Sequence, residues 1–151
     1  MDELQDLYQE IILSHNKRPR NEGELPEHTH QAEGYNPLCG DKVKVFLKVE
    51  NGVVAGVSFQ GDGCAISRAS ASMMTERLKG CPVGEMDARV AEVVGMLAGP
   101  VEPVLDLATD GDLAALAGVR KFPARIKCAT LAWHAAEEAL EKGAENPPAA
   151  G

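Results

Sequence analysis

Residues 42–60 read KVKVFLKVENGVVAGVSFQ, and this stretch decides the fold because it alternates apolar and polar residues on both sides of a turn signal. Alternation with a period of two is typical of strands that bury one face. Asn51-Gly52, between the two runs, is typical of a β-hairpin turn. Two antiparallel strands are therefore expected. The positions expected on their apolar faces are Val43, Val45, Leu47, Val49, Val53, Ala55, Val57 and Phe59.

The length of the hairpin loop sets which residues face each other across the two strands. A two-residue loop would pair Leu47 with Gly56 and would interrupt the apolar face of each strand. A three-residue loop over 50–52 would instead pair Leu47 with Ala55 and keep both faces apolar. The sequence therefore predicts a three-residue loop with a G1 bulge, in which Gly52 is left-handed.

Helical patterns on both sides of the hairpin predict an α+β fold. Helices are expected over about 2–14, 65–79, 89–97 and 112–118, and from Phe122-Pro123 to about 142. The polar residues 22–35 are expected to form a loop. We expect one domain over 1–142, with a small antiparallel sheet of about three strands and helices packed on one face. A disordered tail is expected at 143–151.

The composition excludes several classes of protein. The net charge of −8 over 151 residues argues against nucleic-acid binding, which needs a basic face. No apolar run is long enough to span a bilayer, and the acidic start does not resemble a signal peptide. We therefore expect a cytoplasmic protein that binds neither nucleic acid nor membrane.

Three of the four cysteines occur where a turn or a helix start presents a side chain. Cys39 precedes a glycine and Asp41, Cys64 follows the glycine-rich 61–63, and Cys128 lies in the first turns of the last predicted helix. Thiolate and carboxylate groups are both zinc ligands. In a cytoplasmic chain, such cysteines favour metal binding or reactivity over disulfide bonds. From the spacing alone, a buried structural role stays open for each cysteine.

The histidines and one basic stretch have several interpretations. His28 and His30 lie in the polar loop and are expected to be exposed to solvent. His134 lies off the face of the last helix that carries the cysteine, and His15 is expected to have a helix-end or docking role. The basic residues around 15–21 form either a solvated turn or a patch that docks a partner.

Longer blocks of sequence carry a more specific signal. They are Leu7-Tyr8 with Ile11-Ile12, His15 with Pro19-Arg20-Asn21, NPLCGD at 36–41, GDGCAISRASASMM at 61–74 and FPARIKCATLAW at 122–133. In this order, the blocks resemble the SufU branch of the IscU/NifU-like iron–sulfur assembly family. The resemblance covers nearly the whole chain before the tail.

The resemblance implies an IscU-like fold and a metal site. It implies that Cys39, Asp41, Cys64 and Cys128 are the metal ligands, and it leaves Cys81 outside the motif as a spectator thiol. The implied cofactor is Zn²⁺, with an iron–sulfur cluster on the same ligands as the alternative.

Two features separate the chain from the scaffold branch of the family. Lys127 stands where the scaffold branch has a histidine, and the segment 96–118 resembles the insertion of the SufU branch. Both favour a zinc-dependent sulfurtransferase that accepts persulfide sulfur on Cys39 from a SufS-type cysteine desulfurase and passes it to a downstream iron–sulfur scaffold. Arg125, on the helix face of Cys128, is expected to supply positive charge to the site. A cluster scaffold and a structural zinc module are the alternatives.

Overall fold

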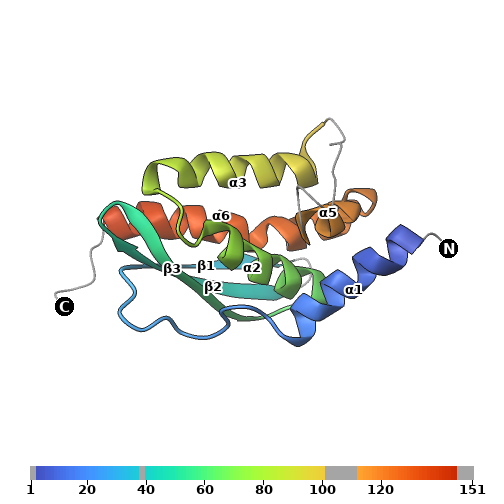
Figure 1. Ribbon diagram of the computed structural model, residues 1–151, viewed down its shortest axis with the longest axis horizontal. Helices are drawn as coiled ribbons and strands as arrows, with labels where there is room; N and C mark the ends of the chain where they lie inside the picture. The colour runs from blue at the N-terminus through green and yellow to red at the C-terminus, as the bar shows by residue number, and fades with distance from the viewer. Residues whose placement is uncertain (1–2, 38–39, 101–111, 146–151) are drawn as a thin grey trace.

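The computed structural model describes residues 3–37, 40–100 and 112–145, and this part of the chain forms a three-stranded antiparallel sheet with helices (Figure 1). The strands are β1 (His30–Asn36), β2 (Asp41–Glu50) and β3 (Val53–Asp62), in the order β1-β2-β3. The helices are α1 (Glu3–Lys17), α2 (Ala65–Leu78), α3 (Val83–Ala98), α5 (Asp112–Leu116), the 3₁₀ helix η1 (Ala117–Lys121) and α6 (Pro123–Glu145). The predicted α+β class is confirmed. Within the described residues, no helix combines the length and the hydropathy needed to cross a membrane.

Helices cover one face of the sheet, as predicted. α6 packs on β1 and β2, and α2 packs on β3 beside it. α3 packs against α6 on the side away from the sheet, and α1 lies against α2 and α5 (Figure 1). The connecting segment after α1 covers the other face, where Leu25 lies against Gly56 and the His28 ring meets the Phe46 ring edge-on at 4.9 Å.

The β2–β3 hairpin has a shorter loop than predicted. Glu50 pairs with Val53, so the loop contains only Asn51 and Gly52. Both loop residues are left-handed, with φ of 51° and 75°, as in a type I′ turn. The predicted three-residue loop is therefore wrong, although the left-handed conformation of Gly52 is confirmed.

A bulge in β3 restores the apolar face that a two-residue loop would interrupt. Val49 pairs with Val54, and the next pair is Lys48 with Gly56, so Ala55 is the extra residue. After this bulge Leu47 is paired with Val57 instead of Gly56. Before the bulge, Val54 is buried instead of the expected Val53 and Ala55, so the predicted apolar face of β3 is wrong there. After the bulge, Val57 and Phe59 are buried as predicted. The buried residues of β3 are Val54, Val57, Ser58 and Phe59.

β1 is the strand that the sequence did not reveal. Its residues 30–36 lie within the stretch predicted to be a loop, and only Ala32 and Asn36 are buried. A Cβ atom at Gly34 would lie 3.0 Å from Leu131 Cδ1, so the strand uses glycine and alanine to let α6 approach closely. Small and polar residues give no apolar alternation, which explains the wrong loop prediction.

Three helices are longer than predicted, and the first of them, α1, ends at Lys17 rather than near residue 14. α3 begins at Val83, directly after its N-cap Pro82, rather than at Arg89. α6 continues to Glu145 rather than ending near 142, and the rest of the expected tail lies outside the described residues. The predicted start of α2 after Cys64 is confirmed.

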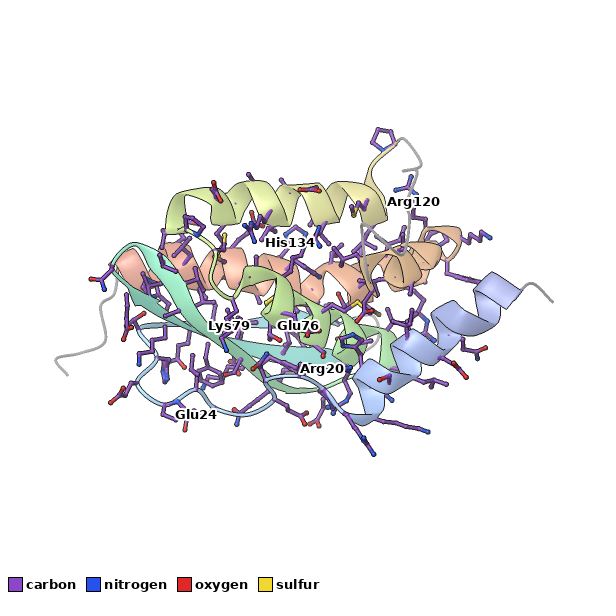
Figure 2. All side chains as sticks on the ribbon, viewed as in Figure 1. Arg20, Glu24, Glu76, Lys79, Arg120 and His134 are labelled. Atoms are coloured by element: carbon purple, nitrogen blue, oxygen red, sulfur yellow. The ribbon has the colours of Figure 1, made fainter. Side chains whose placement is uncertain are left out.

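Arg120, in η1, is hydrogen-bonded to the C-terminal end of α3 and so links helical segments on either side of residues 101–111. Its guanidinium donates to the carbonyl oxygens of Met96 at 2.8 Å and Gly99 at 2.7 Å, which lie at the C-terminal end of α3 (Figure 2). A cation at this end also interacts favourably with the helix dipole. Residues 101–111 lie outside the described residues.

The seam between α2 and α6 fixes the two helices that carry cysteines. Trp133 is fully buried and its indole N–H donates to Ser70 Oγ at 2.9 Å. The Ser70 hydroxyl in turn donates to the Ala129 carbonyl oxygen. These side-chain bonds set the position of Cys128 on α6 relative to α2.

Gly61→Ala is expected to destabilise the protein by about 3 kcal/mol, because the new methyl group has no room. A Cβ atom at Gly61 would lie 2.1 Å from the Lys42 carbonyl oxygen, which belongs to the neighbouring strand. Gly84→Ala is the control: nothing lies within 4 Å of its Cβ position, and Ala favours the helix by up to about 1 kcal/mol. Urea unfolding of both variants measures the difference. Equal stabilities would contradict the close packing of β2 and β3.

Candidate metal centre

Three of the predicted ligands converge from three different elements. Asp41 is the first residue of β2, Cys64 is the N-cap of α2, and Cys128 lies in the second turn of α6. One donor atom from each lies within 4.8 Å of the donors from the other two. The fourth predicted ligand, Cys39, lies outside the described residues. The described part of the predicted site is therefore an Asp/Cys/Cys group able to bind a metal ion.

The Asp41 carboxylate holds the start of α2 in place. Its Oδ1 accepts the Cys64 backbone N–H at 2.9 Å, and its Oδ2 lies 3.5 Å from Cys64 Sγ. Cys64 Sγ also accepts the Ser67 backbone N–H at 3.4 Å, in the manner of a helix N-cap. A Cβ atom at Gly63 would lie 3.0 Å from Asp41 Oδ1, so the glycine allows this close approach.

The three donors differ in their access to solvent. Asp41 is 2% exposed and Cys128 is 1% exposed, whereas Cys64 is half-buried. The Asn36 amide donates to Cys128 Sγ at 3.9 Å, from the end of β1. Sequence reasoning did not assign Asn36 to the site, although it begins the same NPLCGD block that contains Asp41.

Arg125 adds positive charge beside the two cysteines. The thiolate of Cys64, and to a smaller extent that of Cys128, raises the pKa of the Arg125 guanidinium above its usual value. Arg125 is exposed in the first turn of α6. The helix N-termini near Cys64 and Cys128 carry partial positive charge as well, so negative charge on the sulfur atoms is favoured.

The donor set and its spacing fit a zinc ion. Tetrahedral zinc with Zn–S of about 2.3 Å and Zn–O of about 2.1 Å would separate a sulfur from an oxygen by about 3.6 Å. The Cys64 Sγ to Asp41 Oδ2 separation of 3.5 Å matches this value. Two thiolates and one carboxylate also leave a position for another donor.

Cys81 lies outside this group of donors, as predicted. It is fully buried at the end of the α2–α3 connection, and burial raises the pKa of its thiol. Its thiol group donates to the Pro82 carbonyl oxygen at 3.2 Å. A protonated, buried thiol has little reactivity.

The histidines lie elsewhere in the described structure. His28 and His30 are partly buried rather than exposed, and burial lowers the pKa of His30. His134 is exposed on α6 beside Glu137. His15 is only 1% exposed in the last turn of α1, so the helix-end position is confirmed but the side chain is buried.

Comparison with known proteins identifies the family of this chain. A family model described as the NifU-like N terminal domain matches residues 7–129. The chain belongs to the NifU-like N-terminal domain family. Within this family it is similar to the zinc-dependent sulfurtransferase SufU of Bacillus subtilis, with 41% identity over 92% of this chain and 92% of the relative.

Other NifU-like relatives have similar sequences and structures. The iron–sulfur cluster assembly scaffold protein IscU of Streptococcus pyogenes is 37% identical over 95% of this chain and 89% of its own length. The N-terminal domain of a NifU-like protein from Brucella abortus has a TM-score of 0.80 and 26% identity, over 95% of this chain and 98% of that one. The predicted IscU-like fold and the resemblance to the SufU branch are confirmed.

Proposed function

We propose that this NifU-like protein works in iron–sulfur cluster assembly as a zinc-dependent sulfur acceptor. Its sulfur donor is the persulfide of a SufS-type cysteine desulfurase, and its recipient is a downstream iron–sulfur scaffold. The observation that carries the proposal is the convergence of Asp41, Cys64 and Cys128, with Cys39 only two residues from Asp41 in the sequence. The similarity to the zinc-dependent sulfurtransferase of Bacillus subtilis supports the proposal.

Each residue of the site has a separate role in this proposal. Asp41, Cys64 and Cys128 hold the zinc ion, and Cys39 completes the ligand set between transfers. Zinc, when bound, favours deprotonated thiolates at neutral pH and has no redox chemistry of its own. Asn36 donates to Cys128 Sγ and so helps to retain this sulfur as a ligand.

Cys39 is the residue that receives sulfur. Its thiolate attacks the terminal sulfur of the persulfide on the desulfurase. A new S–S bond forms on Cys39 while the S–S bond of the donor breaks, and the donor cysteine leaves as a thiolate. The exchange is neutral in electrons, so it needs no added oxidant or reductant.

Arg125→Met is expected to slow sulfur transfer roughly tenfold or more while zinc content is retained, because the variant removes positive charge where a persulfide anion approaches. Arg125 is exposed beside Cys64 and Cys128, so the change does not disturb the core. Lys142→Met, which removes an exposed basic residue at the far end of the same helix, is the control for net charge. Single-turnover transfer rates and zinc analysis measure both effects. Equal rates in the two variants would exclude a specific role for Arg125.

The function is tested by mixing the purified protein with a SufS-type desulfurase and cysteine carrying labelled sulfur. We expect label to move to this protein as a persulfide. We also expect at least one zinc ion per protein, whether or not air is excluded during purification. Protein that contains zinc but never acquires label would overturn the proposed function.

A cluster scaffold is the second candidate function, because the Streptococcus pyogenes relative carries that name and thiolates also bind iron–sulfur clusters. Anaerobic reconstitution with iron and sulfide separates the two functions. A scaffold would develop visible absorbance with stoichiometric iron and sulfide. The zinc protein is expected to keep its metal and remain colourless. Lys127, in place of a histidine beside Cys128, favours the sulfur acceptor.

A further inference from the structure

A second group of donor atoms lies on helices away from the cysteines, at the seam of α1, α2 and α5. His15 comes from the last turn of α1, Glu76 from α2 and Asp112 from the start of α5. One donor atom from each lies within 4.8 Å of the other two. Figure 2 shows Glu76 on α2 and Arg20 in the segment that follows α1.

The imidazole of His15 is fixed in position from both sides. The ring is 1% exposed, its Nδ1 lies 2.7 Å from Ser72 Oγ, and its Nε2 contacts Asp112 Oδ2. Ser72 Oγ also accepts the Arg20 backbone N–H at 2.8 Å, which fixes the serine in turn. A histidine that ligates a metal through one nitrogen commonly donates its other N–H to a polar partner. Ser72 is placed to accept that N–H.

Two carboxylates face this ring. Glu76 Oε1 lies 3.9 Å from His15 Nε2, and Asp112 contacts the same nitrogen. Among the residues that the structure describes, neither carboxylate forms a salt bridge with lysine or arginine. A divalent cation would supply the missing positive charge and bring the two acidic side chains together.

We propose that His15, Glu76 and Asp112 form a second metal site, which takes a divalent transition-metal ion of the Zn²⁺ type through one nitrogen and two oxygen donors. Imidazole and carboxylate are both zinc ligands, with adjacent donors separated by about 3.4 Å in a tetrahedral site. The Glu76 side chain is 51% exposed and that of Asp112 is 43% exposed, so both are free to adjust by small rotations around the fixed ring. Water completes the coordination on the open side.

The bound ion joins three helices through one side chain from each. α1 packs against both α2 and α5, and Asp112 is the first described residue after the segment 101–111. An ion held by one residue from each helix therefore stabilises the docking of α1 against α2 and α5. This site is independent of the proposed sulfur transfer, because it contains no cysteine.

Cobalt binding distinguishes the two sites by their ligands. Co²⁺ on thiolates gives strong charge-transfer absorbance, whereas Co²⁺ on nitrogen and oxygen alone gives only weak bands. Equilibrium dialysis of the zinc-free full chain against Co²⁺ is expected to give two bound ions, with the charge-transfer band saturating at the first. Competition with Zn²⁺ should displace both ions.

Glu76→Gln and Asp112→Asn are expected to reduce binding from two ions to one, with an unchanged charge-transfer band. Both residues are partly exposed, so the variants should fold. Glu92→Gln removes an exposed glutamate on α3 and should retain two ions. The second ion should raise the thermal unfolding midpoint of the wild type but not that of the two site variants. One bound ion in the wild type, or two in both site variants, would overturn the proposal.

Discussion

Cys39→Ala is expected to abolish persulfide acceptance, with a loss of several orders of magnitude in transfer rate. The reason is chemical, because alanine has no atom that can form the new S–S bond. Asp41, Cys64 and Cys128 remain, so the variant should still bind zinc, with reduced affinity. Labelled-sulfur transfer and zinc analysis on the same sample separate the loss of acceptance from the loss of metal.

Cys81→Ala is the matched control for this experiment. It also removes one thiol, but Cys81 is fully buried with a raised thiol pKa and lies outside the donor group. We expect transfer at the wild-type rate. If Cys39→Ala accepted sulfur as fast as this control, Cys39 would not be the acceptor, and the half-buried Cys64 would be the next residue to test.

Cys128→Ser is expected to weaken zinc binding on the order of 100-fold, about one ligand's share of the binding free energy of a four-ligand structural site. A buried hydroxyl is nearly the same size as the thiol but does not ionise at neutral pH. Cys128 is 1% exposed, so solvent cannot readily replace the lost donor. Competition with a chromophoric chelator measures the affinity.

Two comparisons make the Cys128→Ser result specific. Cys81→Ser places a serine at another buried cysteine and should leave zinc affinity unchanged, because its hydroxyl can donate to the Pro82 carbonyl oxygen. Circular dichroism should show both variants folded at room temperature. Wild-type zinc affinity in Cys128→Ser would remove this cysteine from the ligand set.

The sequence predicted the structure best at glycine, cysteine and aspartate motifs, because these residue types have few alternative structural roles. Glycine before Cys64 and the small residues after it predicted the start of α2, and the structure confirms it. The NPLCGD block predicted that Asp41 would join the cysteines, and the three described donors do converge. Residues with specific chemistry therefore predicted the site better than apolar alternation predicted the strands.

The errors in strand prediction have a common physical cause. β1 buries Ala32 and Asn36 and places Gly34 under Leu131, so its fit to α6 depends on the lack of bulk rather than on apolar side chains. The hairpin register depends on the bulge at Ala55, which a pattern with a period of two does not encode. Both features depend on the packing of distant segments, which a local pattern does not contain.

The buried environment of His15 was also beyond sequence reasoning. The side chain is held by Ser72 and Asp112, which are far from it in the sequence and come from two other helices. Only the packing of α1 between α2 and α5 brings these residues together. The family-like block around His15 indicated that the position matters without indicating its partners.

The two carboxylate oxygens of Asp41 make different interactions, which affects how a bound metal ion could exchange its ligands. Oδ1 is committed to the Cys64 backbone N–H, while Oδ2 faces the sulfur of the same residue. This arrangement favours coordination of an ion through Oδ2 alone. In the proposed zinc site, this hydrogen bond between Asp41 and Cys64 favours displacement of a different ligand when an incoming group binds.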